Sequence, residues 1–272
     1  MLAPAMAIFG WFCFWPLWRL IHYALYQQNQ IGSRERYVGP KQLTDTLTSG
    51  DFGHGLAHTF LIMIYSVPLG VLLGVLLAVA AHRQLRGIKI FQTIFSSTIA
   101  SSTAVAAVVF FTLVNPSVGY FRSVSWLDLN HGASALFAVS LSSVWQNLGL
   151  TFVIVLAGLQ TVPEEITEAA TLDGYGPVRR FFRITVPLIS PTLLFLAVVL
   201  SVQSLQLLAP IEFLTNGGPA GATQNLLFKI THNQQPANLG TGAAMSIGLF
   251  VITTLVAMAQ FLILDRRVHY GD

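Results

Sequence analysis

Charged residues are scarce in this chain. Only 9% of its 272 residues are Asp, Glu, Lys or Arg, whereas 54% are hydrophobic, and the mean hydropathy is +0.66. Soluble globular domains are about 25% charged. The composition therefore excludes an ordinary soluble domain and indicates a membrane protein. The formal net charge of +3 is small, so the sequence implies no nucleic-acid partner.

Cysteines and catalytic motifs are also lacking. The single cysteine, Cys13, lies in an apolar run, which excludes a disulfide framework. None of the three lysines lies in a G-x-x-x-x-G-K-[ST] phosphate loop, and the metalloprotease and serine-hydrolase signatures H-E-x-x-H and G-x-S-x-G are missing. His54 and His58 have only Asp51 as a nearby carboxylate, which favours two interfacial histidines over a metal site. We therefore predict a chain with no catalytic residues, no metal and no cofactor of its own.

Long apolar runs are what the sequence has instead. The first covers 23 residues and would span roughly 35 Å as a helix, enough for a bilayer core of about 30 Å. A cleaved signal peptide is the competing interpretation, but the basic leader and the small-residue cleavage site are missing. The sequence predicts an all-α membrane protein, a single transmembrane domain over residues 1–272, with six spans at about 3–25, 59–81, 90–114, 133–158, 192–211 and 240–264.

The polar residues around these runs are informative. Residues 27–57 are polar and glycine-rich, which predicts an irregular loop. Residues 93–103 are rich in Ser and Thr, which suggests close packing between helices. No acid or base lies in the middle of any predicted span. A central charge costs at least about 2.5 kcal/mol, so carriers that need one for ion coupling keep it. The absence argues against a proton-driven symporter, and we expect another chain to supply the energy.

Residues 161–191 form a long polar stretch between two apolar runs that still has a helical pattern. Thr161 and Glu164 have the spacing of a capping box. Gly174 can end the first helix in a left-handed conformation, and Pro177 can begin a second one. The pattern predicts a helical hairpin at a membrane face, a shape suited to docking a partner.

The distribution of Lys and Arg predicts the orientation. Eight lie in short segments that we place inside, and five lie in segments that we place outside, with Arg19 left in the first span. The inner set is Arg83, Arg86, Lys89, Arg179, Arg180, Arg183, Arg266 and Arg267; the outer set is Arg34, Arg36, Lys41, Arg122 and Lys229. The hairpin and both termini are therefore expected in the cytoplasm.

Two motifs carry a family resemblance. The first is the spacing of Glu168, Ala169, Ala170, Asp173, Gly174, Phe182, Ile184, Pro187 and Pro191, which resembles the EAA loop of ABC importer permeases. It departs at Val186, where the family usually has Leu. The second is the run at 213–219, FLTNGGP, which is similar to the T-x-G-G-P segment of carbohydrate-uptake permeases. The segments 176–184 and 260–270 look like those of glycerol-3-phosphate and glycerophosphodiester permeases, although sugar and oligosaccharide permeases share much of the pattern.

The resemblance implies a type I ABC importer transmembrane domain in a bacterial-type inner (plasma) membrane. It implies a second permease subunit, two ATPase subunits that bind ATP and Mg, and an extracytoplasmic solute-binding protein. Glu168, Ala169, Ala170, Asp173 and Gly174 would form the ATPase-docking surface, through which ATP drives alternating access. Two other classes stay open: a secondary carrier or channel that needs no nucleotide, and an intramembrane enzyme or assembly factor, which the missing catalytic motifs disfavour.

Five uncharged residues are candidates for the solute pathway. Trp145 and Asn147 lie in the middle of the fourth span, and Gln203, Ser204 and Gln206 lie in the fifth. Amides and hydroxyls suit a hydroxyl-rich solute, and an indole can stack on a sugar or a choline head. A phosphate would ordinarily need Arg or Lys, which neither span offers at this depth. The alternative is that these groups only join helices, at about 0.6 kcal/mol each.

Overall fold

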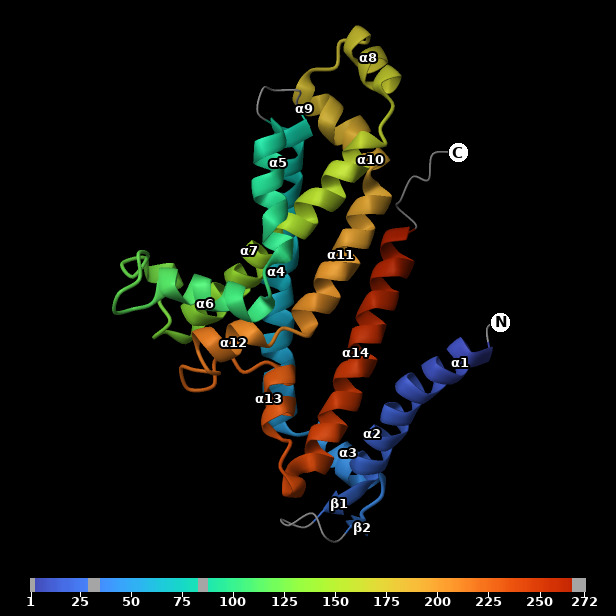
Figure 1. Ribbon diagram of the computed structural model, residues 1–272, viewed down its shortest axis with the longest axis vertical. Coiled ribbons are helices and arrows are strands. Elements are labelled where there is room, and N and C mark those ends of the chain that lie inside the picture. The colour runs from blue at the N-terminus through green and yellow to red at the C-terminus, as the bar shows by residue number, and fades with distance from the viewer. Residues whose placement is uncertain (1–2, 29–34, 83–87, 266–272) are drawn as a thin grey trace.

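The protein is described by a computed structural model over residues 3–28, 35–82 and 88–265, and it is almost entirely helical (Figure 1). Its α-helices are α1 (Ala3–Phe9), α2 (Trp15–Leu25), α3 (Pro40–Leu47), α4 (Gly50–His82), α5 (Ile88–Ser96), α6 (Thr103–Val114), α7 (Gly132–Gln160), α8 (Glu164–Leu172), α9 (Pro177–Arg180), α10 (Val186–Leu188), α11 (Ser190–Leu205), α12 (Ala209–Leu214), α13 (Leu226–His232) and α14 (Leu239–Asp265). Short π and 3-10 turns are η1 (Gly10–Phe14), η2 (Ser97–Ala100), η3 (Ser125–Leu127), η4 (Phe181–Thr185) and η5 (Pro236–Asn238). Two antiparallel strands, β1 (Tyr26–Gln28) and β2 (Glu35–Tyr37), pair Tyr26 with Tyr37.

Four helices in the described ranges are long and apolar enough to cross a membrane: Pro4–Leu25, Gly50–His82, Gly132–Gln160 and Pro236–Ile263. Two bent helix pairs raise the number of candidate spans to six if each pair counts as one span. The predicted all-α membrane fold is confirmed. The count of six spans is not confirmed, because it depends on these two bent pairs. The third predicted span is bent within its length, and the helix of the fifth, α11, follows a bend of 71° at the break between Leu188 and Ser190.

The third predicted span, 90–114, is broken. Helix α5 continues into η2, and α6 then leaves at an angle of 110°. The hydroxyl-rich stretch provides the physical reason. Ser101 is extended, and Ser102 is the N-cap of α6, where its side chain accepts a hydrogen bond from the Val105 N–H at 3.3 Å. Ser side chains that bond to nearby backbone groups favour helix ends over helix interiors.

The boundaries of the second and fifth spans also differ from the prediction. Helix α4 begins at Gly50 instead of residue 59, and the predicted loop at 27–57 contains β1, β2 and α3. Gly39 precedes α3 and Gly50 begins α4, whereas residues 29–34 of the predicted loop lie outside the described ranges. The fifth span ends at Leu205 instead of residue 211, after which the chain turns into the short helix α12. Helices α7 and α14 lie within a few residues of their predicted positions.

The core lies between α4 and α7, which make the most extensive helix pair, with α11 packed against both. One apolar cluster joins Ile62, Phe110 and Val139 with residues of α12, and a second joins Phe152 and Leu196 with neighbours on α4 and α5. A third cluster ties the first turn of α4 to α13 and α14. The molecule is therefore held along its length by α4.

The two ends of the long axis differ (Figure 1). Helices α8 and α9 lie at one end, beside the C-terminal end of α4 and the start of α5. Helix α3, the two strands and the start of α14 lie at the opposite end. The orientation inferred from charge needs this arrangement, since it requires the hairpin at 161–191 and the C-terminal end of α4 to lie on the same side. Which end faces the cytoplasm stays a prediction. Part of it rests on residues 29–34, 83–87 and 266–272, which lie outside the described ranges.

Candidate solute pocket and docking hairpin

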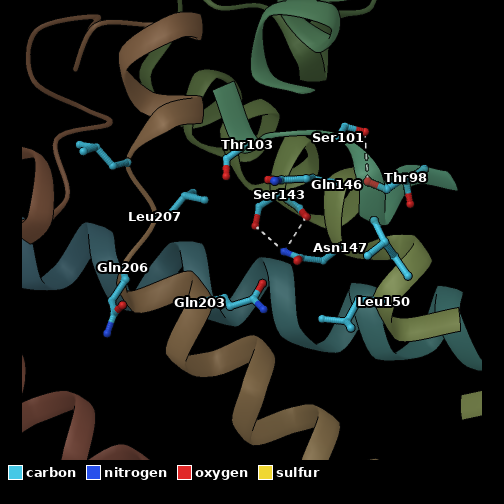
Figure 2. Close-up of a pocket in the computed structure, with 12 residues that line it drawn as sticks. Thr98, Ser101, Thr103, Ser143, Gln146, Asn147, Leu150, Gln203, Gln206 and Leu207 are labelled. Carbon is cyan, nitrogen blue, oxygen red and sulfur yellow. Dashed lines mark hydrogen bonds between the residues drawn. The ribbon is translucent and has the colours of Figure 1, made fainter. Parts of the chain in front are cut away.

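A pocket of about 400 Å³ lies where the break between η2 and α6 meets α7 and the C-terminal end of α11 (Figure 2). Its polar lining consists of Thr98, Ser101, Thr103, Ser143, Gln146, Asn147, Gln203 and Gln206, and its apolar lining of Ile99, Leu150, Leu207 and Leu208. None of these lining residues carries a charge. A lining of hydroxyls and amides both donates and accepts hydrogen bonds, which suits a neutral polar ligand or the hydroxyl-bearing part of a larger one.

The broken helix supplies the hydroxyl wall. The Ser101 hydroxyl donates to the Thr98 carbonyl at 3.0 Å, and the Thr98 hydroxyl donates to the Phe95 carbonyl at 3.1 Å. These bonds close the last turn before the break. Thr103 is the first residue of α6, so both sides of the break contribute to the pocket. In a continuous helix, successive side chains point in different directions around the axis, so Thr98, Ser101 and Thr103 would not all face one pocket.

Helix α7 supplies the opposite wall. The Asn147 side-chain amide donates to the Ser143 carbonyl at 3.1 Å, and Ser143 is only 1% exposed. The donor side of Asn147 is thus used within α7, and its carbonyl oxygen is the group that it can offer to a ligand. Gln146, the residue before, also lines the pocket.

The end of α11 supplies two further amides. The Gln206 N–H bonds to the carbonyls of Val202 and Gln203, both at 3.2 Å, and α11 ends there. The Gln203 and Gln206 side chains are exposed. Gln206 also borders a second, mostly apolar hollow of about 520 Å³ between α13 and α14. It therefore stands between the two cavities.

The structure separates the five predicted pathway residues. It brings Asn147, Gln203 and Gln206 together in the pocket lining. Trp145 instead packs into the core, with its ring centroid 6.2 Å from that of Phe110, and Ser204 is buried outside the lining, at 2% exposure. That any of these residues contacts a solute stays a prediction.

Sequence reasoning did not assign Thr98, Ser101, Thr103, Ser143 and Gln146 to this site. The available signal was the cluster of hydroxyls in an apolar run, which was interpreted as helix packing. A cluster of this kind also breaks helices, and a broken membrane helix exposes its ends to a cavity.

The hairpin follows the predicted outline with one correction. Gly174 has φ +79°, and the Tyr175 N–H bonds to the Ala170 carbonyl at 3.0 Å, so α8 ends in the expected left-handed turn. Pro177 begins α9 as expected. The predicted capping box is wrong, because Pro163 is the N-cap and the Thr161 hydroxyl donates to the Gly158 carbonyl instead.

The predicted docking residues are not equally accessible. Glu168, Ala169, Asp173 and Gly174 are exposed, whereas Ala170 is 5% exposed and packs within the chain. Leu172, which the motif did not single out, is 90% exposed. The Arg180 guanidinium donates to the Thr171 hydroxyl at 2.6 Å and so joins α9 to α8. The hairpin thus exposes acidic and apolar side chains, and the hydrogen bond between Arg180 and Thr171 holds its two helices together.

No group of three or more His, Cys, Asp or Glu that could hold a metal occurs within the described ranges. The Nδ1 of His58 lies 3.0 Å from the Gln224 carbonyl, to which it donates. His58 therefore joins two segments of the protein.

Comparison with known proteins gives the family. Residues 47–270 match the family model described as the inner membrane component of binding-protein-dependent transport systems. The chain belongs to this family, the permeases of ABC importers. The family match begins before α4 and includes the pocket and the hairpin.

The permease is similar over its whole length to several curated proteins named sn-glycerol-3-phosphate transport system permease protein UgpA. Identity is 31% to the Brucella abortus protein and 30% to the Rhizobium meliloti protein, in each case covering 100% of this chain and 95% of the relative. Identity to the Yersinia enterocolitica protein is 33%, covering 98% of this chain and 93% of the relative.

Two solved structures share the fold. A bacterial ABC transporter involved in alginate import matches with a TM-score of 0.80 at 22% identity, covering 98% of this chain and 94% of that one. The alginate transporter in complex with its pentasaccharide-bound periplasmic protein matches with a TM-score of 0.83 at 21% identity, covering 100% and 95%. At these identities the likeness concerns the fold alone.

Proposed function

We propose that this permease is one of two membrane subunits of an ABC importer that takes up glycerol-3-phosphate or glycerophosphodiesters. The observation that carries the proposal is the full-length similarity, at 30–33% identity, to permeases named for sn-glycerol-3-phosphate transport in three genera. The pocket at the end of α11 is the proposed passage of the solute. Its hydroxyls and amides can bond to the hydroxyls of glycerol.

The uncharged lining limits what the pocket can recognise. Moving a phosphate out of water without a counter-charge costs several kcal/mol or more in free energy. The described residues that line the pocket contain neither Lys nor Arg. We propose that this subunit holds the hydroxyl-bearing part of the solute, and that the partner permease or the binding protein meets the phosphate.

The energy comes from partner chains in this proposal. Two ATPase subunits bind ATP and Mg and dock on the hairpin through Glu168, Ala169, Asp173 and Gly174, with Ala170 packed beneath them. Hydrolysis drives alternating access by rocking the permease pair. The hairpin and both termini then lie in the cytoplasm, and an extracytoplasmic binding protein delivers the solute. The solved alginate transporter with its periplasmic protein supports the last partner by likeness of fold.

A sugar or oligosaccharide is the second candidate solute. The observation that favours it is the same uncharged lining, which suits a neutral solute without help from another subunit. A secondary carrier is a distant alternative, and it differs in needing no ATP.

Uptake by the reconstituted importer tests the proposal. Vesicles would contain this permease with its partner permease and ATPase subunits, and the binding protein would be added outside. We expect labelled glycerol-3-phosphate to accumulate only when ATP is enclosed in the vesicle lumen, on the side of the ATPase subunits. Unlabelled glycerophosphocholine should compete with glycerol-3-phosphate for uptake. Accumulation of labelled maltose but not of glycerol-3-phosphate would favour the sugar importer, and uptake without ATP would contradict the ABC mechanism.

A further inference from the structure

The segment 206–233 is fixed from within the chain. It begins just after α11 and includes α12, the turn with the cis Gly218–Pro219 bond, and α13. Thr223 and Asn225 in this segment are both 0% exposed. The Thr223 hydroxyl pairs with that of Thr215 at 2.7 Å and donates to the Gly218 carbonyl at 2.9 Å. The turn is therefore closed by the hydroxyls of two of its own residues, of which Thr223 is buried.

Asn225 joins this turn to the pocket. Its carbonyl oxygen accepts a hydrogen bond from the Phe228 N–H at 2.8 Å, which caps α13, and its amide nitrogen donates to the Leu207 carbonyl. Leu207 lines the solute pocket, immediately after α11 ends. Its carbonyl thus lies just past the helical hydrogen-bond ladder, and Asn225 supplies a donor.

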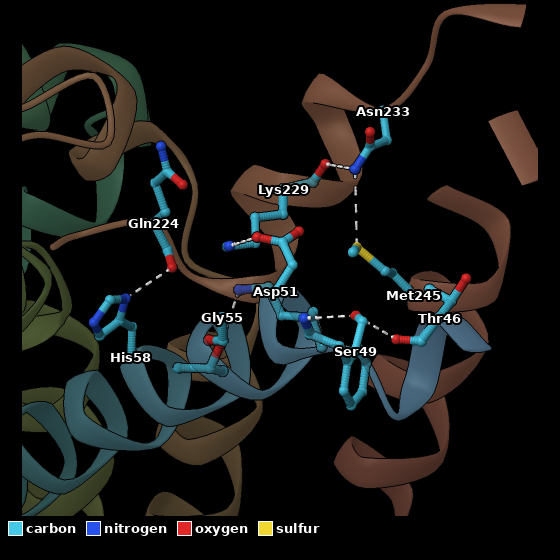
Figure 3. Close-up of polar contacts among 12 residues, drawn as sticks. Thr46, Ser49, Asp51, Gly55, His58, Gln224, Lys229, Asn233 and Met245 are labelled. Carbon is cyan, nitrogen blue, oxygen red and sulfur yellow. Dashed lines mark hydrogen bonds and ion pairs between the residues drawn. The ribbon is translucent and has the colours of Figure 1, made fainter. Parts of the chain in front are cut away.

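Helix α13 is in turn held on α4 (Figure 3). The Leu226 N–H donates to the Thr59 hydroxyl oxygen at 3.0 Å, and Thr59 donates to the Gly55 carbonyl at 2.7 Å. One turn after Leu226 on α13, the Lys229 ammonium forms an ion pair with Asp51 near the start of α4. A Cβ at Gly55 would lie 3.0 Å from the Lys229 side chain, so glycine lets the two helices approach closely. A side chain on α4 therefore fixes the start of α13.

We propose that Asn225 and Thr59 are positioning residues for solute recognition. They form a buried chain of hydrogen bonds from α4 through α13 to Leu207, and this chain holds one wall of the pocket at a fixed distance from Asn147 on α7. Neither residue lines the pocket. The inference rests on the proposed function, because it takes the pocket as the passage of the solute.

Asn225→Asp tests the link most directly. The carboxylate keeps the acceptor for Phe228 but loses the donor and places an oxygen against the Leu207 carbonyl. The half-saturating concentration of glycerol-3-phosphate in vesicle uptake should rise at least about tenfold, because the lost hydrogen bond and the buried carboxylate both displace the Leu207 wall. Asn238→Asp, the same change at an exposed position, is the matched control and should leave it unchanged.

Hydrogen exchange gives a readout that does not depend on the solute. In the assembled importer, backbone amides of residues 207–214 should exchange faster in Asn225→Asp than in Asn238→Asp. If the importer carries a different solute, uptake of glycerol-3-phosphate fails in the unaltered protein but this difference in exchange persists. Failure of the proposed solute and failure of the positioning role are thereby distinguished.

Thr59 supplies the second test, which decides the matter if Asn225→Asp does not assemble. Thr59→Val removes the hydroxyl that accepts from Leu226, whereas Thr59→Ser keeps it. We expect Thr59→Val to accelerate exchange at 207–214 and to raise the half-saturating concentration severalfold, and Thr59→Ser to restore both. Equal exchange in Thr59→Val and Thr59→Ser, or a change confined to maximal rate, would overturn the proposal.

Discussion

The hairpin at 161–191 and the segment 206–233 are both short, irregular helical connections, yet they are built in opposite ways. In the hairpin Ala170 and Ile189 are the buried residues, while Leu172 and Phe182 are 90% and 65% exposed. In the segment 206–233, Asn225 and Leu226 are both 0% exposed and hydrogen-bonded. The two regions lie at different levels along the axis (Figure 1).

The difference shows where the chain is complete by itself. The segment 206–233 satisfies its buried polar groups within itself and through Thr59 on α4, so its shape is set within this subunit. The hairpin forms hydrogen bonds within its own turn but leaves Leu172 and Phe182 exposed. Large apolar side chains that face water indicate a surface for a partner.

A charge at the buried position 170 of the hairpin should have the largest effect on ATP hydrolysis by the importer. Ala170→Asp would bury a carboxylate, which costs several kcal/mol without a partner, and solute-stimulated ATP hydrolysis should be lost. Ala169→Asp, one residue away and exposed, should leave the hairpin folded and reduce stimulation only partly. The ATPase rate of the assembled importer measures both. Full stimulation in Ala170→Asp would contradict the role of the hairpin.

Cysteines placed at the two ends of the long axis should react with a thiol reagent from opposite sides of the membrane. In a Cys13→Ser background, which removes the exposed native thiol, a cysteine at Thr44 should react with an impermeant thiol reagent added outside. A cysteine at Pro177 should react only after the membrane is opened. The reverse pattern would overturn the orientation inferred from charge.

Truncating pocket amides should weaken solute uptake by a smaller factor. Gln206→Ala or Asn147→Ala removes one hydrogen bond to a neutral group, worth about 1 kcal/mol, and should raise the half-saturating concentration about fivefold. Ser204→Ala on the same turn of α11 is the control, because Ser204 is buried outside the lining. Unchanged kinetics in both pocket variants, with normal assembly, would remove these residues from the site.

The ion pair of Asp51 and Lys229 should contribute least. The Lys229 side chain is 11% exposed, but that of Asp51 is 59% exposed, and ion pairs at the surface are worth about 1 kcal/mol or less. Asp51→Asn should therefore lower the thermal stability of the assembled importer only slightly and leave uptake intact. A loss as large as that from Asn225→Asp would show that the ion pair, rather than the buried amide, fixes α13.

The membrane class, the helical content and the turn at Gly174 could be predicted from the sequence. These properties depend on neighbouring residues: a run of apolar side chains of bilayer length, and a glycine that adopts φ +79° at little cost. The same local reasoning placed α7 and α14 within a few residues. It also selected Asn147, Gln203 and Gln206, since an uncharged polar residue inside an apolar run is conspicuous without any knowledge of its surroundings.

Only the tertiary structure decided which polar residues share a cavity and which are buried. Trp145 and Asn147 are two residues apart, but one faces the core and the other the pocket, because neighbouring helices determine what each face of α7 meets. The break at Ser101 depends on whether hydroxyls bond to their own backbone or across to another helix, a competition that composition does not resolve. The contact between Thr59 and Leu226 joins residues 167 positions apart, and no local pattern encodes a partner at that distance.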